Sequence, residues 1–186
     1  TIEAKRIVNE ELGSPVESIF SSFSDSVAAA SIAQVHKATV KETKELVAVK
    51  ILRPDVEKVF LRDLAALLFL AKFIEFIIPS FRRLKPTEVI NHFERLVREE
   101  LDLRMEISAA AEFAENTKSD RNFYVPKVIW SLSGRRVVTT EWVDGMSVGD
   151  IDRIKNSGVD IESFAKRIIK TFLTQALRDG FFHGDM

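Results

Sequence analysis

Two neighbouring segments have residue types and spacing that suit the binding of phosphate groups. The first is the small-residue run Ala28-Ala29-Ala30-Ser31-Ile32-Ala33, which Gln34 and Val35 follow, and the second is Val47-Ala48-Val49-Lys50. A turn of small residues lets the backbone close over phosphates, and a Lys on the next strand neutralises their charge. A tight hairpin with no ligand explains the Ala-rich run equally well.

Lys50 interrupts an apolar strand pattern that runs from Leu46 to Leu52. Because an unpaired buried ammonium group is costly, a Lys between Val49 and Ile51 predicts an acidic partner elsewhere in the chain. The alternative is an edge Lys whose stem packs on the strand while its ammonium reaches water.

Acidic residues that could supply this partner follow in a helical segment. Asp102 and Glu106 are four positions apart and share a helix face, and Glu100 lies just before them. Such carboxylates can bind magnesium or form an ion pair with a buried Lys. They can equally be solvated charges, since Arg98 and Arg104 are close enough in sequence to pair with them.

The third group is Phe182-His183-Gly184-Asp185, after an amphipathic helix. A His and an Asp two positions apart are weak evidence alone, but the order of the groups along the chain is informative. The order along the chain is a small-residue loop, a strand Lys, a helical Glu, two strands, a helix and then His-x-Asp. Protein kinases have this order, and there the last Asp is the catalytic-loop carboxylate.

The elements that must position these residues can be predicted from periodicity and end signals. Gly13 ends a helix, Lys41 to Glu45 form a hairpin loop, Ser133-Gly134 form a turn, Gly158 ends a short helix, and Asp160 caps a final one. The predicted helices are 2–12, 56–78, 87–113, 148–157 and 161–178, and the runs 27–40, 46–52, 124–131 and 136–141 are read as strands or hairpins. The apolar stripe of the 87–113 helix is Val89, Phe93, Leu96, Leu103 and Ile107, with Glu100 in the place of one apolar residue. Early in the chain we expect three strands, and later two.

Composition excludes several kinds of site. Lys and Arg total 27 against 28 Asp and Glu, so the net charge of -1 gives no basis for predicting a nucleic-acid partner. The absence of Cys excludes a disulfide framework, a thiolate metal site and a Cys nucleophile. The most apolar stretch, 64–81, contains Lys72, Glu75 and Pro79, which favours a buried or interfacial helix over a membrane span. Its residues Leu67 to Leu70 with Phe73, Phe76, Ile77 and Ile78 fit either core packing or a patch that faces lipid.

The sequence resembles the UbiB/ADCK family of atypical kinases, which is linked to ubiquinone biosynthesis. The resemblance covers nearly the whole chain and rests on the Ala-rich run, on Val47-Ala48-Val49-Lys50-Ile51-Leu52-Arg53-Pro54, and on Glu100-Leu101-Asp102-Leu103-Arg104. Tyr124-Val125-Pro126-Lys127-Val128 and Glu141-Trp142-Val143-Asp144-Gly145 add to it. An Ala-rich loop and a helical Glu-x-Asp are marks that ordinary protein kinases lack.

The resemblance implies an α+β, protein-kinase-like fold. We expect a five-stranded antiparallel N-lobe over residues 1–144, with a helical insertion at about 55–118, and the first C-lobe helices over 145–186. The chain begins at Thr1 and ends at Met186 directly after Asp185, so we expect a fragment truncated at the catalytic loop.

The resemblance also assigns expected roles to residues. Lys50 would contact the α- and β-phosphates, Glu106 would be its partner, and Asp185 would be the catalytic-loop Asp with His183 as its structural neighbour. Glu100 and Asp102 would form the family's acidic motif at the mouth of the active site, and Glu141 to Val143 would be the hinge beside the adenine. The expected nucleotide-binding residues are Ala28, Ala29, Ala30, Ser31, Ile32, Ala33, Val35, Ala48, Lys50, Glu141 and Val143.

The implied ligands are ATP and Mg²⁺, with the main metal ligands expected beyond Met186 and none within the chain. The family's Lys-x-Gly-Gln motif is absent and is expected before Thr1, and the catalytic-loop Asn and Asp-Phe-Gly motif are expected after Met186. We therefore expect no ATP turnover by these 186 residues alone. The implied partners are membrane lipids or quinone precursors and quinone-biosynthesis proteins, with no nucleic acid.

The implied location is the cytoplasmic face of a bacterial inner membrane, or a mitochondrion or plastid in a eukaryote. Two other functions stay open from the sequence. One is a kinase for proteins or small molecules, and the other is a non-catalytic ATP-binding module that assembles a biosynthetic complex.

Overall fold

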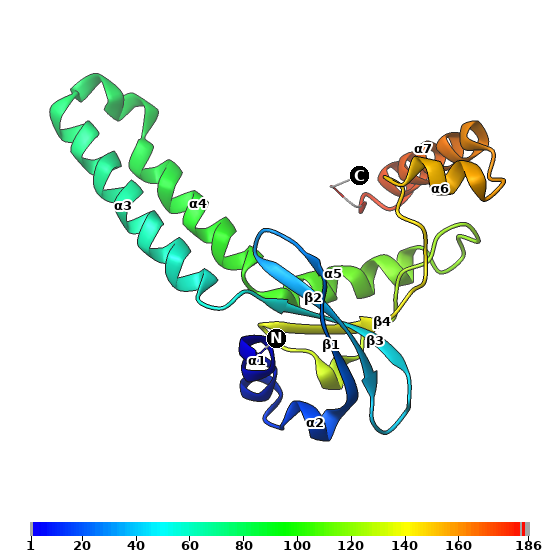
Figure 1. Cartoon of the computed structure of the whole chain (residues 1–186). Coiled ribbons are helices and arrows are strands. Elements are labelled where there is room, and N and C mark those ends of the chain that lie inside the picture. The colour runs from blue at the N-terminus through cyan, green and yellow to red at the C-terminus, as the bar shows by residue number, and fades with distance from the viewer. Residues whose placement is uncertain (1, 183, 185–186) are drawn as a thin grey trace. The chain divides into compact units, whose positions relative to one another are not determined.

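A computed structural model of the chain describes residues 2–182 and 184, which fold as two compact α+β and α-helical units (Figure 1). The first unit contains the chain up to Ile107 together with Val128–Glu141, and the second contains Ser108–Lys127 and the residues from Trp142 onward. The division falls inside one helix, α5 (Leu103–Asn116). The predicted domain boundary after residue 144 stays a prediction.

A four-stranded antiparallel sheet forms the centre of the first unit. Its strands follow the order β1 (Phe20–Ala29), β2 (Ala33–Val40), β3 (Leu46–Leu52) and β4 (Val137–Glu141). The predicted hairpin loop between 41 and 45 joins β2 to β3, and Lys44 adopts a left-handed backbone conformation with φ of 62° there. The α+β fold with an antiparallel kinase-like N-lobe sheet is therefore confirmed.

The expected count of five strands is wrong for the described residues. The predicted strand at 124–131 forms only an isolated bridge between Val128 and Thr140, and the chain then turns through the short 3₁₀ helix η2 (Trp130–Leu132). Ser133 explains this turn, because its hydroxyl donates to the carbonyl oxygen of Ile129 (2.9 Å) and accepts from the backbone N–H of Thr139 (2.9 Å). A side-chain hydroxyl thus takes ladder positions that a fifth strand would need.

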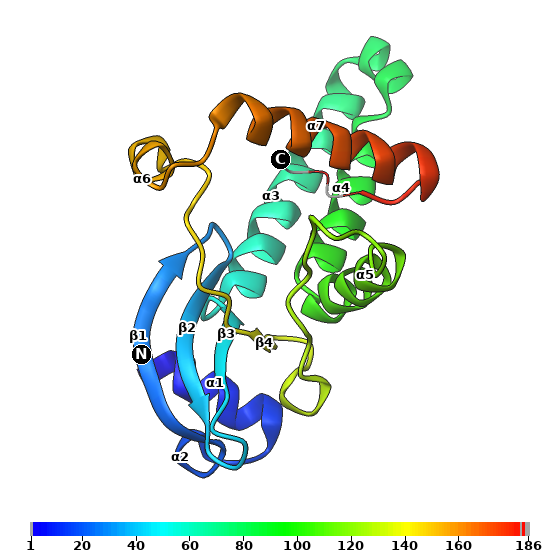
Figure 2. The same ribbon diagram turned by 90° about the vertical axis from the view of Figure 1, so that its right-hand side faces the viewer.

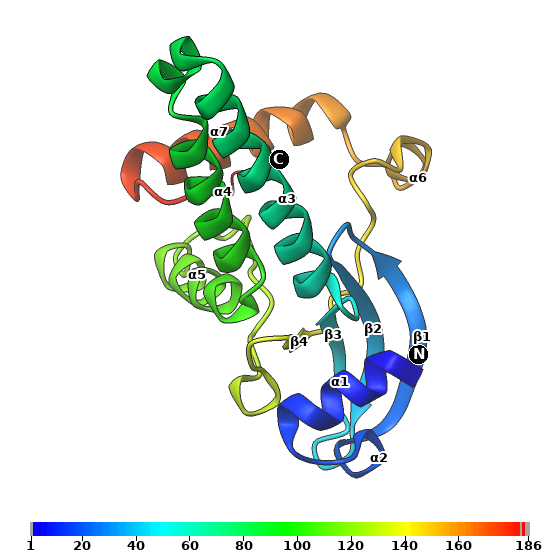
Figure 3. The ribbon, with the colours of Figure 1, turned by 90° about the vertical axis from the view of Figure 1, so that its left-hand side faces the viewer.

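The sheet packs its apolar face against α1 (Ile2–Leu12), which crosses it in Figure 3. Ile7 and Val8 of the helix and Val47, Val49 and Ile51 of β3 are buried in this core. The short helix α2 (Val16–Ile19) then leads into β1. Gly134 permits a close approach to α1, because a Cβ at this position would lie 2.5 Å from the Glu11 carboxylate.

Two antiparallel helices and a connecting 3₁₀ helix follow β3 and form a long hairpin (Figures 1 and 2). They are α3 (Val56–Ile77), η1 (Pro79–Leu84) and α4 (Pro86–Glu100). The predicted helix over 56–78 is confirmed. The hairpin projects from the sheet in both views, and we refer to residues 76–85 as the hairpin tip.

The predicted continuous helix from 87 to 113 is wrong, because the chain breaks between α4 and α5. The backbone N–H of Leu103 donates to the carbonyl oxygen of Arg135 (2.9 Å), and Leu101 and Leu103 are both buried. The predicted apolar stripe is divided accordingly. Leu103 and Ile107 are buried, whereas Val89, Phe93 and Leu96 are exposed.

In the second unit, aromatic contacts and ion pairs hold the helices together. Phe113 lies edge-on to Phe123 and Phe181, at centroid distances of 5.0 and 6.0 Å. Arg178 pairs with Asp120 (2.8 Å) and Asp179 (2.6 Å). The two remaining helices of this unit are α6 (Ile151–Asn156) and α7 (Ile161–Arg178).

The predicted cap of α7 and the predicted glycine stop after α6 are confirmed, whereas the predicted start of α6 is wrong. Asp160 caps α7 by accepting a hydrogen bond from the N–H of Glu162. Gly158 adopts a φ of +79° after α6, which begins three residues later than predicted.

Candidate functional site

Lys50 and Glu106 form an ion pair in the first unit. Lys50 Nζ lies 2.6 Å from Glu106 Oε2 and 2.8 Å from Oε1, so one ammonium group contacts both carboxylate oxygens. The Lys50 side chain is 30% exposed and that of Glu106 is 49% exposed. The acidic partner that the Lys predicts is present, and both groups are accessible to a ligand.

The sheet places Lys50 on the face opposite α1. Val47, Val49 and Ile51 are fully buried against that helix, and side chains alternate between the faces of a strand, so Ala48 and Lys50 point to the other side. Residues directly opposite on neighbouring strands share a face. Val35 on β2 and Val138 on β4 are both paired with Lys50, so they lie on this face too.

The small-residue run forms the turn between β1 and β2. The N–H of Ala30 donates to the carbonyl oxygen of Ala33 (2.9 Å), and the N–H of Arg53 donates to that of Ile32 (2.8 Å). Ala28 is paired with Val35, so Ala28, Val35 and Lys50 follow one another in a single row across three strands. Residues 28–31 are exposed, and their role in binding a nucleotide stays a prediction.

Asp102 explains why Glu106 has a fixed position. Its Oδ1 accepts from the backbone N–H of Arg104 (3.1 Å), which makes Asp102 the N-cap of α5, the helix whose first turn contains Glu106. Asp102 also pairs with the side chain of Arg104, with Nη2 2.6 Å from Oδ2, and this guanidinium lowers the pKa of the Asp102 carboxyl.

The contacts of the acidic residues test whether these carboxylates are ordinary surface charges paired with Arg98 and Arg104. Arg104 pairs with Asp102, as ordinary surface charges would, but Arg98 pairs with Glu94 (2.7 Å) rather than with the Glu100–Glu106 group. Glu100 is the exposed last residue of α4. The role of Glu100 and Asp102 as an acidic motif stays a prediction.

The remaining predicted site residues lie outside this arrangement or beyond description. Glu141 is the last residue of β4, whereas Val143 belongs to the second unit, where its side chain is exposed. Asp185 and His183 lie outside the described residues. The hinge and catalytic-loop roles thus stay predictions.

Sequence reasoning missed Arg135 as a positioning residue. Its carbonyl oxygen accepts from Leu103 at the start of α5, and its side chain pairs with Glu57 at the start of α3 (2.7 Å). Glu11 of α1 accepts from its backbone N–H. The only local signal is the preceding Gly134, because the other partners are far away in sequence.

Neither a metal site nor a span is found in the described part of the chain. Over residues 2–182 and 184, no three His, Cys, Asp or Glu side chains are grouped in a way that would hold a metal ion. The helices of the same residues are all too short or too polar to cross a bilayer.

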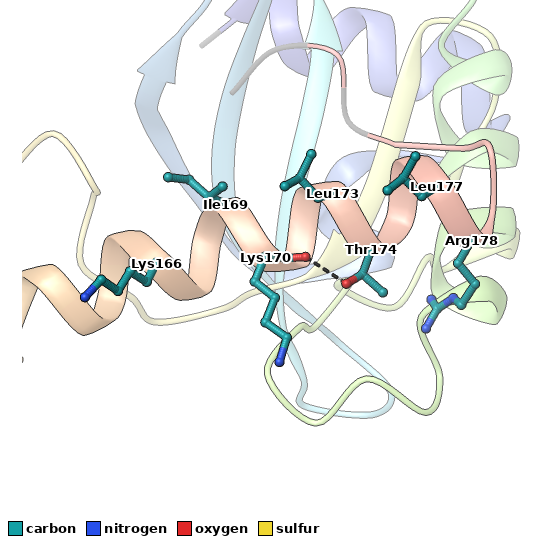
Figure 4. Close-up of a pocket in the computed structure, with 7 residues that line it drawn as sticks. All are labelled: Lys166, Ile169, Lys170, Leu173, Thr174, Leu177 and Arg178. Atoms are coloured by element: carbon teal, nitrogen blue, oxygen red, sulfur yellow. Dashed lines mark hydrogen bonds between the residues drawn. The ribbon is translucent and has the colours of Figure 1, made fainter.

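A shallow groove in the second unit runs along α7 and is lined by that helix alone (Figure 4). Ile169, Leu173 and Leu177 form its apolar part, and Lys166 and Lys170 border it. It contains none of the predicted site residues.

Comparison with known proteins matches the sequence of this chain to one family. The ABC1 atypical kinase-like domain matches residues 1–186. A "Probable protein kinase UbiB" of Aliivibrio fischeri (strain MJ11) is 39% identical over 184 residues, which cover 98% of this chain and 34% of the relative. The protein of the same name from Vibrio cholerae (strain ATCC 39541 / Classical Ogawa 395 / O395) is 36% identical over 186 residues, all of this chain and 34% of the relative.

This chain spans about a third of the length of the curated relatives that it matches. The family model, by contrast, matches it from end to end, and the sheet with its Lys50–Glu106 pair agrees with a kinase-like N-lobe. The chain therefore belongs to the ABC1 atypical kinase-like family, whose curated relatives are named UbiB.

Proposed function

We propose that the chain is the nucleotide-binding part of a UbiB-type atypical kinase or ATPase that supports ubiquinone biosynthesis. The observation that carries this proposal is the Lys50–Glu106 ion pair on the open face of the sheet, in one row with Val35 and the small-residue turn. A cation held by a carboxylate beside a turn of small residues is suited to phosphate groups.

The residues present fit the triphosphate of ATP. Lys50 has three N–H donors, and its half-buried ammonium can hold phosphate oxygens while Glu106 fixes its direction. The exposed backbone of residues 28–31 would cover the phosphates, and Val35 and Ala48 would contact the base from the same sheet face as Lys50. Mg²⁺ would be held mainly by residues that this sequence does not contain, and Asp185 would orient the acceptor.

The link to quinones and lipids rests on the relatives. Their printed name, "Probable protein kinase UbiB", supports an atypical kinase. We extend this to ATP hydrolysis or phosphoryl transfer coupled to membrane lipids or quinone precursors, together with quinone-biosynthesis proteins. We propose the cytoplasmic face of a bacterial inner membrane, or the corresponding organelle membrane in a eukaryote, as the site of action.

Thermal stabilisation and phosphate release measured on the full-length protein test this proposal. The protein is mixed with Mg-ATP, with and without vesicles that contain a quinone-precursor mimic. We expect a rise in melting temperature with Mg-ATP, and a release of free phosphate that the vesicles stimulate. No stabilisation by Mg-ATP would contradict the nucleotide site.

The same assay separates the two other functions. Phosphate that appears on a second substrate rather than in solution would identify a kinase for proteins or small molecules. Stabilisation without any release or transfer would identify a non-catalytic nucleotide-binding module.

A further inference from the structure

The hairpin tip, residues 76–85, exposes large apolar side chains at the junction of α3, η1 and α4. Phe76 is 78% exposed, Leu84 66%, Ile77 55%, Phe81 42% and Ile78 41%. Isolated apolar residues are common on protein surfaces, but a contiguous group of aromatic and aliphatic side chains marks an interaction site.

The charge of the tip has a single sign. Arg82, Arg83 and Lys85 lie within it, and the sequence from 76 to 85 contains neither Asp nor Glu. The Nε–H of Arg82 donates to the backbone carbonyl of Glu75 (2.9 Å), a contact that orients the guanidinium without neutralising it.

The two acidic residues that flank the tip already have partners. Glu75 Oε1 accepts from the backbone N–H of Thr87 at the start of α4 (3.1 Å), and Glu88 pairs with Lys85 (2.9 Å). The tip therefore combines exposed apolar groups with the positive charge of Arg82 and Arg83.

The tip is also far from the nucleotide-binding face within the first unit. α3 has 22 residues, which at 1.5 Å per residue gives about 33 Å, and α4 runs back beside it. Figures 1, 2 and 3 all show the tip at the end of the hairpin that is farther from the sheet. A partner could thus contact the tip without covering Lys50.

We propose that the hairpin tip is a membrane-docking surface that enters the interface of a bilayer with anionic lipids. Phe76, Phe81 and Leu84 would lie among the lipid headgroups and upper acyl chains, and Arg82 and Arg83 would pair with lipid phosphates. Apolar and aromatic residues flanked by Arg and Lys are the chemistry of such interfacial segments, and each basic residue adds attraction to an anionic leaflet. This inference rests on the lipid-linked part of the proposed function and assigns that role to a surface.

Vesicle flotation of the full-length protein tests the proposal with two kinds of vesicle. One is pure phosphatidylcholine, and the other contains about 30 mol % phosphatidylglycerol at the same total lipid and low salt. We expect Arg82→Gln with Arg83→Gln to lower the affinity for the anionic vesicles on the order of tenfold, because two charges near the surface are lost. Phe76→Ser with Phe81→Ser should lower binding to both kinds of vesicle.

Matched controls lie elsewhere in the first unit. Arg62→Gln removes an exposed positive charge from α3 outside the tip, and Leu46→Ser removes an exposed apolar side chain from the start of β3. Both should bind vesicles as the unaltered protein does. Vesicle binding that is absent, or that the tip variants leave unchanged, overturns the proposal.

A fluorescent probe at the tip shows whether lipid or another part of the same polypeptide covers this surface. Ser80→Cys, labelled with a polarity-sensitive dye in a background without other cysteines, should brighten and shift to the blue when anionic vesicles are added, whereas labelled Glu42→Cys in the β2–β3 loop should not. Both positions are exposed. A Ser80 probe that is already shielded before lipid is added, and does not respond to it, shows that other parts of the protein cover the tip and overturns the proposal.

Nucleotide binding keeps this result separate from the proposed function. The tip variants should bind Mg-ATP with unchanged affinity, since none of their residues contacts Lys50 or Glu106. If the unaltered protein bound Mg-ATP but did not respond to vesicles, the docking surface alone would be rejected. If the unaltered protein did not bind Mg-ATP, the nucleotide site would be rejected.

Discussion

At the scale of single residues, the Lys50–Glu106 pair contributes little to the stability of the fold. Its side chains are 30% and 49% exposed, and an ion pair with that access to water contributes about 0 to 1 kcal/mol to stability. The pair instead fixes the direction of the flexible Lys50 side chain, because Glu106 holds its ammonium group over the open face of the sheet. Loss of the pair should therefore change nucleotide affinity while leaving the fold intact.

The first prediction concerns Glu106 as a positioning residue. Glu106→Gln keeps a hydrogen-bond acceptor but removes the charge that orients Lys50, so we expect Mg-ATP affinity to fall about fivefold, the equivalent of about 1 kcal/mol. Titration calorimetry on the full-length protein measures this change in Mg-ATP affinity. Glu17→Gln, which removes the partner of Lys5 (2.9 Å) at a distant exposed pair, is the control. Equal affinities of Glu106→Gln and the unaltered protein would refute the positioning role.

The second prediction concerns His36, a buried histidine of β2 that pairs with Val49 and therefore lies on the sheet face opposite Lys50. Burial lowers the pKa of His36 from its ordinary value near 6.5. Its Nδ1 bonds to the carbonyl oxygen of Ser24 (2.9 Å), and its ring stacks on Phe23 at 4.8 Å. In the described part of the chain its Nε2 has no hydrogen-bond partner.

Because the folded pKa of His36 is the lower one, the unfolded chain binds its proton first as the solution is acidified. The stabilisation from neutral His36 is complete above pH 6.5 and is lost as the pH falls toward the folded pKa. We expect the melting temperature to fall between pH 7.5 and 5.5, with a smaller slope in His36→Gln. A slope that His36→Gln leaves unaltered would contradict this.

At the scale of elements, the break between α4 and α5 is what positions Glu106. Asp102 caps α5, Leu103 donates to Arg135, and Leu103 and Ile107 anchor the helix in the core. One uninterrupted helix would lack both the cap and this tertiary hydrogen bond. The position of the charged partner of Lys50 thus depends on an N-cap.

The third prediction tests this cap. Asp102→Ala should lower the free energy of unfolding by about 1 kcal/mol and also weaken Mg-ATP binding, because α5 loses its N-cap. Asp102→Asn retains a capping acceptor and should therefore keep most of the stability and most of the Mg-ATP affinity. Asp160→Ala, which removes the cap of α7, should cost similar stability with no change in affinity. If Asp102→Ala and Asp160→Ala had the same effect on affinity, the link between cap and site would be refuted.

Most of the elements could be predicted because their signals are local. Gly13 and Gly158 take positive φ where the helices were expected to end, Asp160 caps α7, and the β2–β3 loop lies between 41 and 45. The helix break at Asp102 could not be predicted, since apolar spacing continues across it and its cause, the bond to Arg135, joins distant segments. The false strand at 124–131 has the same origin, because Ser133 provides bonds that a periodicity pattern does not reveal.

The candidate site was predictable to a similar degree. An acidic partner for Lys50 follows from the cost of burying an unpaired ammonium, and the resemblance to the family names Glu106. The exposure of Val89, Phe93 and Leu96 could not be predicted. An apolar stripe on a helix predicts burial, but the pattern does not show whether another element covers the stripe.

At the scale of the whole molecule, the first unit separates two surfaces. The open face of the sheet presents Lys50, and the hairpin tip presents apolar and basic groups at the far end of α3 and α4. The chain spans about a third of the length of its curated relatives, so the full-length protein is the one to assay. We therefore expect the nucleotide and lipid responses to be separable by mutation but joined in turnover.

The fourth prediction tests the nucleotide site by direct calorimetry. Mg-ATP is titrated into the full-length protein, into Lys50→Ala, and into Lys5→Ala, which removes a Lys from an ion pair of comparable exposure on α1. We predict that Lys50→Ala lowers the affinity on the order of tenfold or more, with an unchanged circular dichroism spectrum, because a charge-assisted contact to phosphate is lost. Lys5→Ala should bind as the unaltered protein does. Normal Mg-ATP affinity in Lys50→Ala, or no Mg-ATP binding by the unaltered protein, would contradict the account.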